Sequence, residues 1–135
     1  MRETLERAAS GLVYSSESDE PFTYFALDDA GHRADEPIDA RALASLVGAP
    51  ASAGVTDHAV ADFLARHIQT SDPFDARAQA IRPRYEHLAA VIEQQLRGAR
   101  AIRIVVPGDV RVRCYIAGRD AHGDIAGFVT SAIET

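Results

Sequence analysis

Residues 110–116 read Val-Arg-Val-Arg-Cys-Tyr-Ile, and apolar and polar side chains alternate along them. Successive side chains of a β-strand point to opposite faces of the sheet, so the alternation predicts a half-buried strand. Arg111 and Arg113 are expected to face outward. The side chains expected to face the core are those of Val110, Val112, Cys114 and Ile116.

Further strands are predicted on both sides of this one. Residues 101–106 are rich in β-branched side chains, and a Pro-Gly-Asp turn at 107–109 connects them to the alternating stretch. After a second turn at 120–123, residues 125–133 are expected to form the last strand. With an earlier aromatic strand at 22–27, the sequence predicts a mainly antiparallel sheet of about four strands, with helices packed on it.

Helical patterns fill much of the remaining chain. The longest helix is expected between Asp75 and Leu96, where apolar side chains recur every three or four residues. Pro83 in that stretch predicts either a kink or a helix that begins there. Asp39 is a plausible N-cap for an earlier helix. Apart from the longest helix, the sequence predicts three short ones: residues 4–10, residues 37–47 and a segment that follows Asp57.

The composition is that of one globular domain. The chain has 135 residues, of which 47% are hydrophobic and 25% are charged, and a chain of this length buries one core rather than two. We therefore expect a single domain, residues 1–135, of the α+β class. Neither a signal peptide nor a membrane-spanning stretch is recognisable, so we expect a soluble, cytoplasmic protein that is a monomer when free.

The net charge of −6 limits the possible partners. A nucleic-acid binder normally presents a basic patch that neutralises phosphates, and the basic residues here are mostly scattered. We therefore expect no direct binding of nucleic acid. An acidic surface instead suits a partner protein that is itself basic.

Patterns that would indicate catalysis are missing from the sequence. The five histidines do not form a pair that would place two imidazoles on one helical face, and no G-x-S-x-G elbow is present. Cys114, the only cysteine, is expected to be buried and inert. We therefore expect that the chain is not an enzyme and needs no cofactor.

Two segments resemble the nuclease A inhibitor family. Residues 11–22, Gly-Leu-Val-Tyr-Ser-Ser-Glu-Ser-Asp-Glu-Pro-Phe, carry the family's Ser-Glu-Ser-x-x-Pro-Phe signature. Residues 115–135 are similar to its closing pattern of Tyr-x-x-Gly, Gly-x-x-Ala-Gly, Thr and a final Glu-Thr. Residues 85–96 resemble the family's long helix, whereas residues 26–70 show little family signal. The matches occur in the family's order and at similar spacing.

The resemblance implies an α-β-α sandwich that inhibits a metal-dependent, sugar-non-specific nuclease by covering its catalytic cleft. The family's inhibitory glutamate falls on Glu17, and its C-terminal threonine, directed at the metal ion held by the nuclease, falls on Thr135. An acidic residue before the long helix falls on Asp72. The family has an aromatic residue directly after this acid; here Pro73 follows, so the aromatic contact is assigned to Phe74.

The residues themselves leave two other functions open. The chain could be an interaction module that has the family's fold but binds another basic protein, or a small hydrolase or ligand-binding domain with a site on its loops. Without the resemblance, Glu17 reads as a solvated turn residue and Thr135 as an ordinary chain end. A pocket with clustered ionisable groups would favour the second alternative.

Overall fold

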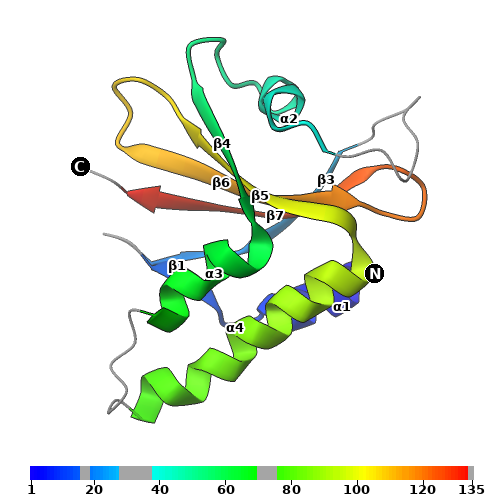
Figure 1. Ribbon diagram of the computed structural model, residues 1–135, viewed down its shortest axis with the longest axis vertical. Helices are drawn as coiled ribbons and strands as arrows, with labels where there is room; N and C mark the ends of the chain where they lie inside the picture. The colour runs from blue at the N-terminus through cyan, green and yellow to red at the C-terminus, as the bar shows by residue number, and fades with distance from the viewer. Residues whose placement is uncertain (16–18, 28–37, 70–75, 134–135) are drawn as a thin grey trace.

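The computed structural model describes residues 1–15, 19–27, 38–69 and 76–133 (Figure 1). Within these ranges the chain forms four helices and seven strands. The helices are α1 (Arg2–Ala9), α2 (Ala40–Leu46), α3 (Val60–Gln69) and α4 (Ala76–Gln95). The strands are β1 (Val13–Ser15), β2 (Asp19–Pro21), β3 (Thr23–Leu27), β4 (Gly54–Ala59), β5 (Arg97–Val105), β6 (Arg111–Arg119) and β7 (Ile125–Ile133).

The strands divide into one main sheet and one small hairpin. The main sheet has the order β3-β7-β6-β5-β4, and all its neighbouring strands are antiparallel. β1 and β2 pair only with each other, also antiparallel, and form a separate two-stranded sheet. The predicted α+β fold with an antiparallel sheet is therefore confirmed, with five strands in the main sheet where about four were expected.

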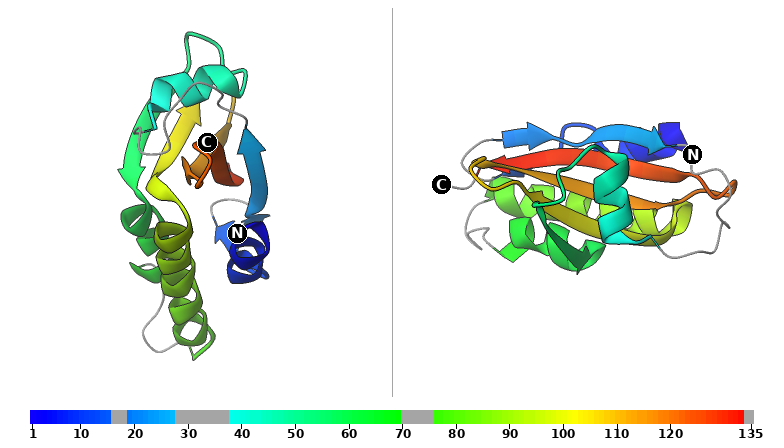
Figure 2. Two further views of the ribbon diagram at one scale, coloured as in Figure 1. Left: turned by 90° about the vertical axis from the view of Figure 1, so that its right-hand side faces the viewer. Right: turned by 90° about the horizontal axis from the view of Figure 1, so that it is seen from above.

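Helices cover both faces of the main sheet, as the left view of Figure 2 shows. α1, α3 and α4 lie on one face, and their core includes Leu5, Leu64, Leu88, Ile92 and Phe128. α2 lies on the other face, where a second core includes Leu43, Ala44, Ile102, Tyr115 and Ile125. The α-β-α sandwich is thus confirmed, with three helices on one side and one on the other.

The alternation that predicted β6 holds along the first half of the strand. Cys114 is fully buried on the face covered by α3 and α4, while Arg111 and Arg113 are exposed on the opposite face. From Tyr115 onward both faces are buried, because α2 covers the second one. Val110 was expected to face the core, but it precedes the strand and its side chain is 51% exposed.

The structure corrects one helix boundary and decides against one of two alternatives at Pro83. The helix expected to follow Asp57 begins only at Val60, because residues up to Ala59 form the edge strand β4. Asp57 pairs with β5 instead of capping a helix, and its Oδ1 accepts a hydrogen bond from Arg100 Nε at 2.7 Å. The long helix does not begin at Pro83, since α4 starts at Ala76 and continues through that residue.

The predicted N-cap of α2 is confirmed. Asp39 Oδ1 accepts hydrogen bonds from the backbone N–H groups of Arg41 at 2.9 Å and Ala42 at 3.2 Å, which satisfies two donors of the first turn. Among the described residues, no helix has both the length and the apolar character that are needed to cross a bilayer.

Candidate functional site

The four predicted contact residues, Glu17, Asp72, Phe74 and Thr135, lie outside the described residues. The structure does describe the helices and strands that flank these residues in the sequence. Glu17 falls between β1 and β2, Asp72 and Phe74 fall between α3 and α4, and Thr135 follows β7. The geometry of these elements is therefore the structural information that bears on the site.

The ends of these elements lie on one side of the molecule. In Figure 1 the ends of β1, α3 and β7 and the start of α4 are all on the left, opposite the N-terminus and α1, with the end of β7 well above the start of α4. The right view of Figure 2 shows the same arrangement from above. We call this region the convergent end and define it by its described border residues: Ser15, Asp19, Gln69, Ala76 and Ile133.

Glu20 of β2 links the hairpin to the last strands of the main sheet. Its carbonyl oxygen accepts a hydrogen bond from Thr130 Oγ1 of β7 at 3.3 Å. Its carboxylate Oε1 lies 3.7 Å from Arg111 Nη1 of β6, and Arg111 is paired directly with Ile133. The Glu20 side chain of the hairpin therefore lies beside Arg111, which pairs with Ile133, the last described residue of β7.

β1 is linked in turn to α3 and α4. The ring of Tyr14 stacks on Phe63 of α3 with centroids 4.8 Å apart and an interplanar angle of 14°. The hydroxyl of Tyr85, from α4, donates a hydrogen bond to the Val13 carbonyl at 2.7 Å and accepts one from Val13 N–H at 3.4 Å. Contacts thus connect the hairpin with both helices that border residues 70–75.

An exposed apolar surface that the sequence pattern did not predict lies beside the convergent end. Val105 and Val110, on either side of the turn between β5 and β6, are 40% and 51% exposed. They precede Arg111, the residue that pairs with Ile133. The sequence carried no pattern that predicts this exposure. The alternation over residues 110–116 instead predicted that Val110 is buried.

The described residues contain no cluster of three or more His, Cys, Asp or Glu side chains that could hold a metal ion. Burial raises the pKa of the Tyr24 phenol, an effect that the nearby guanidinium of Arg2 opposes. This shift has a structural origin, because the Tyr24 ring packs edge-on against Phe128 with centroids 6.5 Å apart. The Cys114 thiol is buried, as predicted.

A family model described as nuclease A inhibitor-like protein matches residues 1–135, the full length of the sequence. The chain belongs to this family. The resemblance recognised in the two end segments is therefore confirmed, and the nuclease A inhibitor-like match also spans residues 26–70, where the sequence analysis found little signal. No curated protein matches the chain.

Proposed function

We propose that this nuclease A inhibitor-like protein binds a metal-dependent, sugar-non-specific DNA and RNA endonuclease and occludes its active site. The observation that carries the proposal is the convergent end, where the ends of β1, α3 and β7 lie on the same side of the molecule. A single cleft in a partner could receive the three segments that follow these elements. Ends on opposite faces of the molecule would have been incompatible with this function.

The proposed contacts act by replacing the phosphate of the substrate. A nuclease of this class holds phosphate with arginine side chains and with a hard divalent cation that prefers oxygen ligands. Glu17 offers a carboxylate for a charge-assisted pair with such an arginine. Thr135 offers oxygen to the metal ion that the nuclease holds, and Asp72 and Phe74 add an acidic and an aromatic contact beside it.

The proposal assigns the catalytic chemistry to the partner. The chain acts as an inhibitor rather than an enzyme, uses no metal or cofactor of its own, and makes no direct contact with nucleic acid. It is a monomer when free and works in the cytoplasm, where it protects the cell that produces the nuclease. The net charge of −6 suits a partner whose active site must attract polyanions.

The direct test is a titration of the purified chain against the metal-dependent, sugar-non-specific endonuclease of the same genome. We expect cleavage of both duplex DNA and single-stranded RNA to stop at an equimolar ratio, because one inhibitor fills one cleft. Unreduced cleavage at a large molar excess would overturn the proposal. Capture of a basic protein without nuclease activity would favour the interaction module instead.

Thr135→Val tests the metal-directed contact separately. Valine keeps the shape of the side chain but removes the hydroxyl oxygen, so we expect a weaker inhibition constant and an unchanged thermal midpoint. The measurement is inhibition at several Mg²⁺ concentrations. An inhibition constant equal to that of the wild type at every concentration would show that this hydroxyl makes no contact with the metal.

A further inference from the structure

The β1–β2 hairpin is positioned by side chains rather than by the ladder of the main sheet. β1 and β2 share three residue pairs, from Val13 with Pro21 to Ser15 with Asp19, and belong to a sheet of their own. Residues 16–18 join the paired ends Ser15 and Asp19, so the placement of the hairpin decides where that short segment begins and ends.

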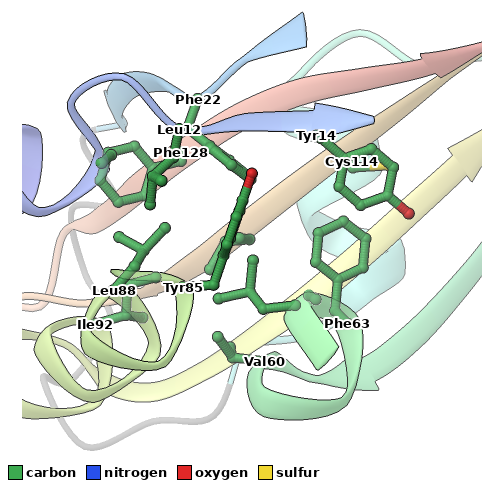
Figure 3. Close-up of a cluster of buried hydrophobic side chains, with 14 of the residues drawn as sticks. Leu12, Tyr14, Phe22, Val60, Phe63, Tyr85, Leu88, Ile92, Cys114 and Phe128 are labelled. Atoms are coloured by element: carbon green, nitrogen blue, oxygen red, sulfur yellow. The ribbon is translucent and has the colours of Figure 1, made fainter. Parts of the chain in front are cut away.

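Tyr85 is the most specific of these side-chain ties. Its ring is only 6% exposed and stands in the core between α4 and β1, with its oxygen at the strand (Figure 3). Because the hydroxyl both donates to and accepts from Val13, it occupies both backbone hydrogen-bonding groups of that residue. A neighbouring strand would ordinarily make such a pair of bonds.

Thr130 ties the other strand of the hairpin. It is 4% exposed on β7, and its hydroxyl donates to the Glu20 carbonyl of β2 at 3.3 Å. The two ties therefore come from α4 and β7. These are also the elements that border the predicted contact residues Asp72, Phe74 and Thr135.

We infer that Tyr85 and Thr130 are positioning residues for inhibition: they hold the β1–β2 hairpin against α4 and β7, and so fix the places of Ser15 and Asp19, between which the proposed contact residue Glu17 falls in the sequence. This inference rests on the proposed function. Its physical basis is preorganisation, since a contact group that is already oriented loses less conformational freedom on binding.

The first experiment compares Tyr85→Phe and Thr130→Val with the wild type. Each variant preserves the side-chain shape and removes the hydroxyl. We expect the inhibition constant to rise by about tenfold in each, because Tyr85→Phe loses the two hydrogen bonds to Val13 and Thr130→Val the one to Glu20, and the net contribution of such bonds is of this order. The matched control is Tyr115→Phe, which removes a hydroxyl from an equally buried tyrosine on the α2 face and should inhibit like the wild type.

A double-mutant cycle separates positioning from a general loss of stability. If Tyr85 acts by placing the hairpin that carries Glu17 in its sequence, Tyr85→Phe should have almost no further effect in a Glu17→Gln background. A variant that only lowers stability would weaken inhibition equally in both backgrounds. Equal effects would therefore overturn the inference even if Tyr85→Phe inhibits poorly.

Hydrogen exchange provides a measurement that does not require the nuclease. In Tyr85→Phe, we expect the amides of Val13 and Glu20 to exchange about tenfold faster, while those of Cys114 and Ile116 in β6 keep their rates. Unchanged exchange in the hairpin would overturn the inference. If Tyr85→Phe does not fold, Thr130→Val carries both measurements.

The outcomes distinguish this inference from the function on which it rests. A wild-type chain that inhibits no such nuclease would overturn the proposed function and, with it, the positioning role. A wild-type chain that inhibits, together with hydroxyl-free variants that inhibit equally well, would overturn the positioning role alone.

Discussion

Gly127 leaves the least room for a side chain among the described glycines. A Cβ atom at this position would lie 1.8 Å from the carbonyl oxygen of Ile116 on the neighbouring strand, and the backbone φ angle is +154°. The approach between β6 and β7 therefore requires glycine in the middle of the sheet. The glycine of the family's closing pattern at this position thus has a structural explanation that needs no contact with a partner.

We predict that Gly127→Ala destabilises the fold by at least about 3 kcal/mol, because the backbone of one of the two strands must move. Gly108→Ala is the control: nothing lies within 4 Å of the added Cβ, and only the positive φ angle of +84° opposes the side chain, so we expect a cost of about 1 kcal/mol. Chemical denaturation of both variants tests this. Equal midpoints for the two would contradict the steric explanation.

Glu17 is the residue on which the proposed inhibition depends most. We predict that Glu17→Gln weakens binding to the nuclease by about 2–5 kcal/mol, because a desolvated arginine of the enzyme loses its charge partner. Glu3→Gln makes the same charge change at an exposed position of α1, away from the convergent end. This variant should bind the nuclease as the wild type does. Calorimetric titration measures both. Comparable losses for the two variants would indicate a net-charge effect.

At the scale of the elements, regular patterns predicted the structure well and short polar segments did not. β6 was predictable because its alternating residues fall on two differently buried faces. The edge strand β4 was missed because Thr56, Asp57 and His58 interrupt any apolar alternation. The β1–β2 hairpin was missed because each of its strands has three residues and its polar sequence resembles a turn.

The cap of α2 provides a prediction at this scale. Asp39→Ala removes the acceptor for two backbone N–H groups, so we expect a loss of about 1 kcal/mol in unfolding free energy. Ser45→Ala, at an exposed position of the same helix, should change the stability little. Thermal unfolding followed by circular dichroism compares the two. An unchanged midpoint for Asp39→Ala would contradict the capping role.

At the scale of the whole molecule, the sequence predicted the layers but not how the contact segments come together. Helical and strand patterns were sufficient for an α-β-α sandwich, because each apolar face must be covered. The candidate contact residues came only from the family motif, since an acidic residue such as Glu17 in a polar turn has no pattern of its own. The placement of the elements that border these residues depends on long-range contacts, such as the hydrogen bond between Tyr85 and Val13. The periodicity of apolar residues does not predict such contacts.

The charge of the whole chain predicts how quickly the complex forms. With a net charge of −6 and a basic partner, association should be electrostatically steered. We therefore expect the association rate constant to fall by about tenfold from low to high salt, with a smaller change in the dissociation rate. Stopped-flow fluorescence measures both rates. An association rate that does not depend on salt would contradict steering.

The separation of the β1–β2 hairpin from the main sheet has an evolutionary consequence. A strand within the five-stranded ladder cannot change its direction without disturbing its neighbours, whereas the hairpin is attached through a few side chains. On the proposed function, substitutions at those attachments would re-aim the hairpin; because Tyr85 belongs to the buried core, the changes that preserve the packing are those that remove a hydroxyl and keep the ring. Such changes would let an inhibitor follow a changing target while the five-stranded ladder stays as it is.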